Sequence, residues 1–440
     1  MKAIVGTGVS GLSAARFLQR CNERFVLFDT RDLPPNRALI AQEFPGVHCE
    51  FGQWDQALLN SADEIIVSPG VPISMPALAK AREAGVPLVG DVEVFCRHAR
   101  APIVAITGSN GKSTVTTLVG KMAEAAGRCV AVGGNLGTAA LDLLNESVEL
   151  YVLELSSFQL ETVSKLGAEV ACVLNISPDH MDRYDSMPAY HAAKQRIYYG
   201  AKKVVVNRTD PLTQPPLAAD VERVSFGGVA DFKNMGTVDK DGELWLAEDL
   251  KPLIPASELR IVGRHNVDNA LAALAIGKAA GLPMIAMLEA LRAFSGLPHR
   301  CEWVAEVDGV GYINDSKGTN VGATLAAIEG LAQAHGKLVL LLGGVAKDDN
   351  FRPLLEALKR HARAAVVFGR DAAIIEKSLA GYSALEREAG LLPALAKARE
   401  LAYSGDTVLL SPACASFDEF DNYMARGETF KHWVKEAAND

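Results

Sequence analysis

The sequence lacks paired cysteines, long apolar runs and an excess of basic residues, and each absence argues against one class of protein. Its seven cysteines are odd in number and include no C-x-x-C pair, which argues against a disulfide framework or a cysteine metal cluster and predicts a reducing, cytoplasmic environment. No uninterrupted apolar run reaches the ~18 residues that a membrane span needs. Basic residues (44) are outnumbered by acidic ones (53), so the net charge of −9 argues against non-specific binding to nucleic acid.

The patterns that are present alternate between short β-branched runs and helical stretches, as is typical of α/β proteins with parallel sheets. A length of 440 residues, at ~150 per domain, predicts about three domains. We expect strands in three series, at 2–5, 25–28, 64–67 and 86–89, then 103–107, 151–155, 170–176 and 203–207, then 337–344, 364–369 and 407–412. Asp241-Gly242 predicts a β-hairpin in the second unit. The expected domains are 1–90, 91–296 and 297–440.

A glycine turn opens the first domain. Gly6-Thr7-Gly8-Val9-Ser10-Gly11 follows a strand and begins a helix, and the acidic Asp29 ends the next strand, 18 residues after Gly11. Glycines allow the backbone to approach a phosphate at the helix N-terminus, and the acid is spaced like a ribose ligand. Arg31, after Thr30, is a candidate second anion contact. Alone, this pattern favours an NAD-dependent oxidoreductase, with another diphosphate ligand or an empty turn as alternatives.

A second glycine loop gives a stronger signal, because it lies between a strand and a helix. Ile103–Thr107 precede Gly108-Ser109-Asn110-Gly111-Lys112-Ser113-Thr114, and a helical pattern follows. In this context backbone amides and a lysine cradle nucleotide phosphates, while a hydroxyl binds Mg²⁺. The loop departs from the usual G-x-x-x-x-G-K-[ST], since Ile106 stands where the first glycine would be. We predict an ATP site here.

Polar residues interrupt or follow the apolar runs beside this loop. Glu154 lies in the strand pattern YVLEL, where a buried carboxylate needs a partner or a metal; an exposed strand end is the alternative. Asp179, His180 and Asp182 follow the next strand and could hold a metal, although a solvated loop fits equally well. Lys194, on an expected helix, has the spacing of an ordinary surface lysine.

The third domain has polar residues after its strands but no decisive motif. Asn314-Asp315-Ser316-Lys317 follow a short strand, and Lys347 follows the glycines of LLLGG. Ser416 and Tyr423 belong to a tail rich in aromatic and acidic residues. These side chains could contact a phosphate or a carboxylate, or they could be exposed loop charges and core aromatics. The residues alone leave this open.

Taken together, the chain resembles the Mur ligase family of peptidoglycan synthesis over essentially its whole length. The motifs that carry the resemblance are TGSNGKST (107–114), GGNLG (133–137), LELSSFQL (153–160), DHMDRY (179–184), GRHNVDNALAA (263–273), GLPHR (296–300), NDSKGTN (314–320) and SPACAS (411–416). The unusual phosphate loop agrees with the family's shorter form. LELSSFQL and the tail SPACASFDEFDNYMARGETF favour the branch that adds D-glutamate, and the D-N-P-R signature of its diaminopimelate- or lysine-adding relatives is absent.

The resemblance implies a fold of three α/β domains: a Rossmann-like UDP-binding domain (1–90), a central ATPase-like parallel sheet with the phosphate loop (91–296) and a Rossmann-like D-glutamate-binding domain (297–440). It implies an ATP- and Mg²⁺-dependent ligase that joins D-glutamate to UDP-N-acetylmuramoyl-L-alanine through an acyl phosphate and a tetrahedral intermediate. Such an enzyme serves cytoplasmic cell-wall synthesis, and hence cell shape and division. We expect a monomer with no nucleic-acid or membrane partner.

The resemblance also implies roles for individual residues. The UDP part would bind Gly8, Val9, Ser10, Thr30, Arg31, Ser68, Pro69 and Gly70, and Asn135 and Ser156 would face the substrate. ATP would bind Gly108, Ser109, Asn110, Gly111, Lys112, Ser113, Thr114, Asn266, Asn269, Arg300 and Asp315. D-Glutamate would bind Lys317, Thr319, Lys347, Ser416, Phe417 and Tyr423. One Mg²⁺ would bind Ser113 and Glu154, and a second would bind His180 and an N-carbamoylated Lys194, with Lys112, His180 and Lys194 as the catalytic residues.

Two other classes of protein remain as alternatives. An NAD-dependent oxidoreductase is favoured by the first glycine turn alone, and a non-catalytic scaffold would bind ATP without releasing phosphate. Because nucleotide and acceptor would bind to separate domains, the ligase interpretation predicts that the third domain closes before chemistry.

Overall fold

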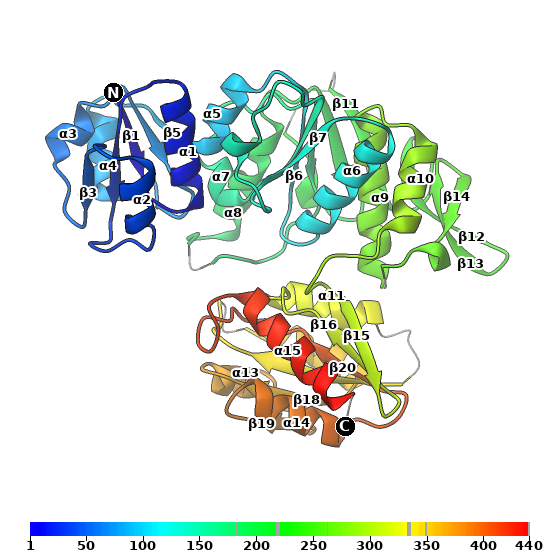
Figure 1. Ribbon diagram of the computed structural model, residues 1–440. Helices are drawn as coiled ribbons and strands as arrows, with labels where there is room; N and C mark the ends of the chain where they lie inside the picture. The colour runs from blue at the N-terminus through cyan, green and yellow to red at the C-terminus, as the bar shows by residue number, and fades with distance from the viewer. Residues whose placement is uncertain (182, 217–220, 262, 332–335, 348–349, 439–440) are drawn as a thin grey trace.

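The computed structural model describes residues 1–181, 183–216, 221–261, 263–331, 336–347 and 350–438, which form three α/β units, each built on its own sheet (Figure 1). The predicted α/β class with three units is therefore confirmed. The domain limits near residues 91 and 297 stay predictions. Within the described ranges, no helix combines the length and apolar character required to cross a membrane.

The N-terminal sheet is fully parallel, in the order β3-β2-β1-β4-β5. Its strands are β1 (Lys2–Val5), β2 (Phe25–Asp29), β3 (Cys49–Phe51), β4 (Glu64–Val67) and β5 (Leu88–Gly90), and its helices are α1 (Val9–Arg20), α2 (Arg37–Glu43), α3 (Gln56–Asn60) and α4 (Pro76–Glu83). Apolar side chains of β1, β2 and β4 alternate between two cores, because helices cover both faces of the sheet. The strand order reverses at β1, so a ligand site is expected between the carboxyl ends of β1 and β4.

The central sheet has the order β14-β13-β12-β11-β10-β9-β6-β8-β7. Its strands are β6 (Ile103–Thr107), β7 (Val130–Gly134), β8 (Leu150–Glu154), β9 (Val170–Val173), β10 (Lys203–Asn207), β11 (Glu222–Val229), β12 (Asn234–Lys240), β13 (Glu243–Glu248) and β14 (Lys251–Pro255). Its helices are α5 (Asp91–His98), α6 (Lys112–Ala125), α7 (Ser157–Leu160), α8 (Met187–Gln195), α9 (Arg264–Ala279) and α10 (Met284–Ala293). Parallel pairing places β8 and β9 on either side of β6.

The predicted β-hairpin is confirmed. β12 and β13 pair antiparallel, with Lys240 opposite Glu243. Asp241 and Gly242 both have positive φ, at 58° and 82°, as a two-residue hairpin turn of this hand requires.

The C-terminal sheet has the order β15-β16-β20-β17-β18-β19. Its strands are β15 (Glu302–Val307), β16 (Val310–Asn314), β17 (Leu338–Gly343), β18 (Ala362–Phe368), β19 (Leu385–Arg387) and β20 (Thr407–Leu410), and its helices are α11 (Val321–Leu331), α12 (Leu354–His361), α13 (Ala372–Ser378), α14 (Leu391–Leu401) and α15 (Tyr423–Ala437). Only the edge pair β15–β16 is antiparallel among these strands. β17 is a continuous apolar run because both of its faces are buried.

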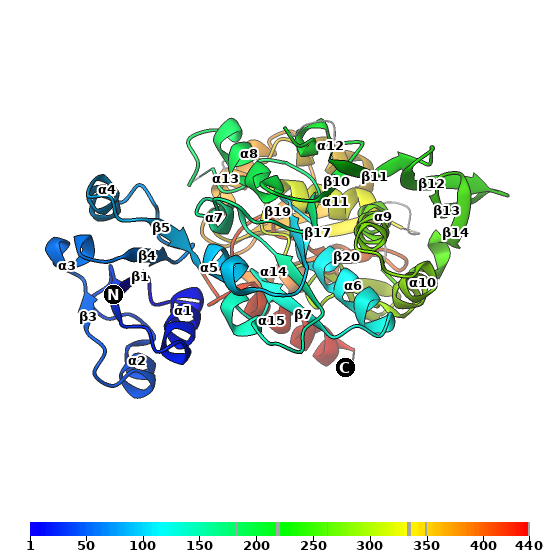
Figure 2. The ribbon, with the colours of Figure 1, turned by 90° about the horizontal axis from the view of Figure 1, so that it is seen from above.

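The three units are arranged around the central one. The N-terminal unit extends from one end of the central unit, beside α5 and α7, while the C-terminal unit lies beneath it in Figure 1 and behind it in Figure 2. α11 of the C-terminal unit packs against α9 of the central unit. This arrangement brings residues of the third unit to the phosphate loop.

Candidate active site

The phosphate loop has the predicted strand–loop–helix geometry. β6 ends at Thr107, and α6 begins at Lys112 after Gly111, which caps the helix in the left-handed region at φ 81°. Gly108 also has a positive φ, 154°. A Cβ at Gly111 would lie 2.4 Å from Oδ1 of Asn269. The backbone conformation therefore favours glycine here, and a Cβ would in addition displace the side chain of Asn269.

Lys112 is held inside this loop. Its Nζ donates hydrogen bonds to the carbonyl oxygens of Gly108 and Ser109, each at 2.9 Å. Burial lowers the pKa of Lys112, although the charges of Glu154 and Asp179 oppose the shift. An ammonium bonded to neutral carbonyls at a helix N-terminus is placed to exchange them for phosphate oxygens.

Glu154 ends β8 beside the loop, as its position in the sequence predicted. It is 2% exposed, and its Oε1 accepts a hydrogen bond from Nδ2 of Asn135 at 2.6 Å. Its Oε2 has no hydrogen-bond partner in the described part of the chain. Burial opposes the charge of this carboxylate, but the charge of Lys112, together with hydrogen bonding from Ser113 and Asn135 and the charge of Arg300, holds the pKa of Glu154 below its ordinary value. The alternative of an exposed strand end is wrong, and the buried oxygen suits a hard cation.

Asp179 and His180 follow β9 and face the same loop. Nε2 of His180 lies 3.5 Å from Oδ2 of Asp179, and Nζ of Lys347 lies 3.5 Å from Oδ1. Burial opposes the charge of Asp179, but the charges of Lys347, His180, Lys112 and Lys194 together keep its pKa below the ordinary value. Asp182, the other acid considered in this segment, lies outside the described residues. Lys347 thus connects the third unit to the central site.

Lys194 is buried in the last turn of α8, so the surface position suggested by its spacing is wrong. It is 2% exposed, its Nζ donates to the carbonyl of Gly108 at 2.8 Å, and it lies 4.7 Å from the centre of the Tyr190 ring. Burial, reinforced by the charge of Lys112, holds the pKa of Lys194 well below its ordinary value. Its neutral amine form is therefore favoured.

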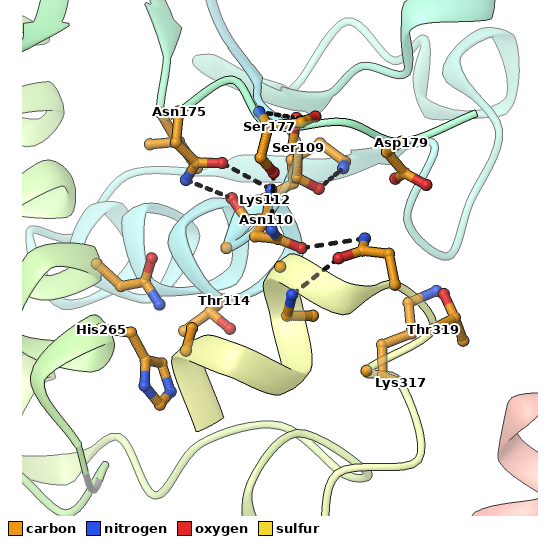
Figure 3. Close-up of a pocket in the computed structure, with 18 of the residues that line it drawn as sticks. Ser109, Asn110, Lys112, Thr114, Asn175, Ser177, Asp179, His265, Lys317 and Thr319 are labelled. Atoms are coloured by element: carbon orange, nitrogen blue, oxygen red, sulfur yellow. Dashed lines mark hydrogen bonds between the residues drawn. The ribbon is translucent and has the colours of Figure 1, made fainter. Parts of the chain in front are cut away.

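Two residues that the sequence analysis did not select, Asn175 and Ser177, form hydrogen bonds with the phosphate loop. Asn175 accepts a hydrogen bond from the Asn110 amide at 2.8 Å and donates one to the Asn110 carbonyl at 3.0 Å (Figure 3). The Ser109 hydroxyl donates to the carbonyl of Ser177 at 2.9 Å and lies 2.9 Å from the Tyr190 hydroxyl. Asn175 and Ser177 directly follow β9, so polar residues at the carboxyl end of a neighbouring strand were the available signal.

The C-terminal unit contacts the loop through Arg300 and Asn320. Nη2 of Arg300 donates to the hydroxyl of Ser113 at 2.9 Å, and Nδ2 of Asn320 donates to Oδ1 of Asn110 at 3.4 Å. Arg300 therefore lies against the hydroxyl that is expected to bind Mg²⁺. Asp315 is buried nearby, and burial raises its pKa to about 6.

The residues expected to bind D-glutamate are only partly brought together. Nζ of Lys317 lies 3.9 Å from the centre of the Tyr423 ring, and burial lowers the pKa of Lys317 to about 8. Thr319 lies close by in the same loop (Figure 3). Ser416 is buried, whereas Phe417 is 73% exposed.

A cavity of about 670 Å³ lies between the central and C-terminal units. The predicted residues that line it are Ser109, Asn110, Gly111, Lys112, Thr114, Asn135, Glu154, Ser156, His180, Lys194, Asn266, Asn269, Arg300, Asp315, Lys317, Thr319 and Lys347. The predicted residues Gly108, Ser113, Ser416, Phe417 and Tyr423 are not part of its lining. His265 and Asp268, which the sequence reasoning did not select, line it. The cavity therefore combines most of the expected nucleotide contacts with half of the expected acceptor contacts.

A second cavity, of about 570 Å³, opens at the carboxyl ends of β1 and β4. All residues expected to hold the UDP part line it: Gly8, Val9, Ser10, Thr30, Arg31, Ser68, Pro69 and Gly70. Asn135 lines both this cavity and the first one. The two cavities are therefore adjacent, and Asn135 forms part of the wall of each.

Asp29, the candidate ribose ligand, is already fully engaged. Its carboxylate accepts bonds from the amide and hydroxyl of Thr7, at 2.9 and 2.6 Å, and from the Arg31 guanidinium at 2.8 Å. Burial opposes its charge, but the bonds from Arg31 and Thr7 outweigh it and lower the pKa of Asp29. A ribose bound to Asp29, as the dinucleotide interpretation expects, would have to replace some of these bonds, so the geometry does not favour it.

Family models of the three Mur ligase domains match most of the chain. Residues 1–90 match the Mur ligase MurD-like N-terminal domain, residues 106–277 the Mur ligase middle domain, and residues 299–414 the Mur ligase glutamate ligase domain. The UDP-N-acetylmuramoylalanine–D-glutamate ligase of Pseudomonas aeruginosa is 56% identical, covering 99% of this chain and 98% of its own. The ligase of the same name from Nitrosococcus oceani is 51% identical over 98% and 96%. This chain belongs to the Mur ligase family.

Solved structures of Mur ligases show the same three-unit fold. The UDP-N-acetylmuramate-alanine ligase of Thermotoga maritima superposes with a TM-score of 0.62 at 20% identity, covering 99% of both chains. MurF of Acinetobacter baumannii gives a TM-score of 0.63 at 17% identity, over 99% of this chain and 90% of its own. At these identities the likeness establishes the fold of this Mur ligase and nothing finer.

The residues of this Mur ligase fit a nucleotide-bound Mg²⁺ better than a protein-caged metal. In the described ranges, no three His, Cys, Asp or Glu side chains form a metal-binding group. Mg²⁺ at a nucleotide is held by one or two protein oxygens together with phosphates and water. The unpartnered Oε2 of Glu154 and the neighbouring Ser113 hydroxyl meet that requirement.

Proposed function

We propose that this Mur ligase joins D-glutamate to UDP-N-acetylmuramoyl-L-alanine with cleavage of ATP, as a step of peptidoglycan precursor synthesis. The relatives of that name share more than half of its residues over nearly the full length. The structural observation that carries the proposal is that Asn135 lines both cavities. A substrate whose UDP part lies at β1 and β4 can therefore extend its carboxylate to the phosphate loop.

The proposed reaction begins with the L-alanyl carboxylate, which is a poor electrophile. It attacks the γ-phosphate of ATP, giving an acyl phosphate and ADP. The amine of D-glutamate then adds to the acyl carbon and its nitrogen loses a proton, and the tetrahedral intermediate expels phosphate to leave the amide. Lys112 would hold the transferred phosphoryl group and offset its charge, since its Nζ already points at the loop carbonyls. Enclosure between two units would protect the acyl phosphate from water.

The proposed cofactor is Mg²⁺ at two positions, which supplies charge neutralisation between the substrate carboxylate and the triphosphate when bound. Ser113 and Glu154 would hold the first ion, and His180 and Lys194 the second. The free Oε2 of Glu154 supports the first position. The second requires Lys194 to become an anion.

A carbamate on Lys194 would meet that requirement. CO₂ adds to the neutral amine, a nitrogen–carbon bond forms, and the displaced proton leaves, so that an oxygen ligand replaces a cation. Burial of Lys194 supports this, because it favours the neutral amine. Intact-protein mass spectra near neutral pH should show one added CO₂ in the wild type and none in Lys194→Ala, which should be inactive. A fully active wild type without the adduct would overturn the carbamate.

We propose that the third unit binds D-glutamate through Lys317, Thr319 and Lys347, with Ser416, Phe417 and Tyr423 completing the pocket. Because Arg300 and Lys347 contact Ser113 and Asp179 across the joint, this unit is placed to close on the nucleotide. The enzyme would act as a monomer in the cytoplasm, and its seven free cysteines agree with a reducing compartment.

Phosphate release tests this function directly. Purified protein with ATP, Mg²⁺ and UDP-N-acetylmuramoyl-L-alanine should release phosphate with D-glutamate and not with L-glutamate, L-lysine or diaminopimelate. Activity with another amino acid but not D-glutamate would assign it to a different Mur ligase. ATP binding without any acceptor-dependent release would identify a scaffold. Fluorescence titration with a nicotinamide cofactor should show no saturable binding, and saturation would favour the oxidoreductase.

A further inference from the structure

Arg426 is a buried arginine that the proposed chemistry does not use. It is 1% exposed and belongs to the first turn of α15, which Asn422 caps by accepting a hydrogen bond from the Ala425 amide at 2.9 Å. Burial lowers the pKa of Arg426 to about 10, so it remains a cation at neutral pH. A buried cation is costly unless its surroundings compensate it, so the bonds that it makes are informative.

Each hydrogen bond that Arg426 donates in the described chain goes to a neutral oxygen. Nε donates to the hydroxyl of Ser316 at 3.0 Å, and Nη2 to the carbonyls of Ser316 and Cys414 at 2.8 and 3.1 Å. Nη1 donates to the carbonyl of Gly343 at 3.4 Å. The rigid guanidinium therefore connects three separate chain segments.

These segments follow three adjacent strands of the C-terminal sheet. Ser316 lies after β16, Gly343 ends β17 and Cys414 lies after β20, and the sheet order is β16-β20-β17. Their carboxyl ends form the edge at which open α/β sheets bind ligands. The same segments contain three residues of the proposed acceptor pocket, namely Lys317, Lys347 and Ser416.

The backbone around Arg426 is closely fitted to it. Val345 and Ala415 pair through two backbone hydrogen bonds, at 2.8 and 2.9 Å, and so join the second and third segments. A Cβ at Gly344 would lie 3.2 Å from Nη1 of Arg426 and 2.1 Å from the Ala415 carbonyl oxygen. A side chain at Gly344 would therefore separate these segments from the guanidinium.

We propose that Arg426 is the positioning residue of the amino-acid pocket: its guanidinium fixes the three segments that carry Lys317, Lys347 and Ser416. The charge of the guanidinium is bonded only to neutral oxygens, and the nearest carboxylates, those of Asp418, Asp315 and Glu419, act on it only through space, so we expect it also to favour an acceptor with a second carboxylate. The inference rests on the proposed function, since it concerns the acceptor of that reaction. Arg426 lines neither the cavity at the phosphate loop nor the UDP cavity, so its effect should be confined to the acceptor.

Separate Michaelis constants for the three substrates test this inference. Arg426→Lys keeps the charge but cannot bridge three segments, and we expect it to raise KM for D-glutamate at least tenfold while KM for ATP and for the UDP-substrate changes less than twofold. Arg426→Met should raise KM for D-glutamate further and reduce the preference for D-glutamate over D-glutamine. Arg363→Lys is the matched control, because Arg363 pairs with Asp406 at the opposite end of the same sheet.

The outcomes are distinguishable. KM for D-glutamate within twofold of wild type in Arg426→Lys, or an equal rise of all three constants with a lowered Tm, would overturn the positioning role. If the Arg426 variants do not fold, Ser316→Ala removes one acceptor of the same guanidinium and should raise KM for D-glutamate two- to fivefold; no rise would contradict the inference. A wild type that releases no phosphate with D-glutamate would instead overturn the proposed function.

Discussion

The two glycine turns of this molecule have the same local structure and different surroundings. Gly6–Ser10 and Gly108–Lys112 each connect a parallel strand to the N-terminus of a helix. Behind the first turn, the Asp29 carboxylate is fully bonded to Thr7 and Arg31. Behind the second, Glu154 has a buried oxygen that accepts no hydrogen bond from the part of the chain that the structure describes, and two lysines donate to neutral carbonyls.

This difference teaches that the glycine turn supplies only the geometry of a phosphate site. Where the charges around the turn compensate one another, the site can bind a ligand but has no group left to act on it. Where burial leaves charges incompletely paired, the site can stabilise charge that develops during a reaction. The cavity at the carboxyl ends of β1 and β4 is therefore expected to anchor the substrate, and the cavity at the phosphate loop to carry the chemistry.

Replacing Lys112 should give the largest effect and most clearly separate the two turns. Without its ammonium, no lysine of the loop remains to offset charge on the transferred phosphoryl group. We expect Lys112→Ala to lower kcat more than a thousandfold, about 4 kcal/mol in the activation free energy, with Tm little changed. The rate of phosphate release in the presence of all three substrates measures kcat.

The matched control for this variant is on the same helix. Lys121 of α6 pairs with Glu124 on the surface, and Lys121→Ala should retain wild-type kcat. If Lys112→Ala kept more than about a tenth of the rate, a loss of less than ~1.4 kcal/mol, the assigned role of Lys112 would be wrong.

The sequence allowed the position of Glu154 to be predicted but not the burial of Lys194. Glu154 ends a strand next to β6, and the carboxyl ends of parallel strands meet at one edge, so local order along the chain was sufficient. The burial of Lys194 depends on how α8 packs onto the loop through Tyr190 and Ser109, a tertiary contact that spacing does not encode. The family resemblance, rather than periodicity, indicated that Lys194 matters.

The secondary structure shows the same contrast between elements that the sequence pattern predicts and elements that it does not. The long apolar runs of the sheets were found because burial on both faces makes them continuous. The short β7, which ends just before Asn135, was missed because its two glycines weaken the strand pattern. The antiparallel β15 was also missed, since half-buried edge strands carry little apolar signal. The burial of Arg426 was not predicted, because a single basic residue in a helix usually lies at the surface.

Replacing Glu154 should give an intermediate effect that tests the unpaired oxygen. Glu154→Gln keeps the shape and the bond to Asn135 but removes the anionic ligand. We expect kcat to fall about a hundredfold at fixed Mg²⁺, ~2.7 kcal/mol, and the Mg²⁺ concentration for half-maximal rate to rise. Glu169→Gln, which alters a surface pair with Lys202, should change neither. An unaltered Mg²⁺ dependence in Glu154→Gln would mean that this carboxylate does not hold the ion.

Replacing Arg31 should give the smallest effect, because the first turn is expected to bind without taking part in chemistry. Arg31 lies in the UDP cavity, about half of its side chain is exposed, and much of its guanidinium is occupied by Asp29. Removing it costs one screened contact to an anion and leaves Asp29 with the bonds from Thr7. We therefore expect Arg31→Ala to raise KM for the UDP-substrate about tenfold, ~1.4 kcal/mol, with kcat and KM for ATP unchanged. A fall in kcat at saturating UDP-substrate would contradict the comparison of the two turns. It would mean that the first turn, whose neighbouring charges are paired, takes part in the chemical step.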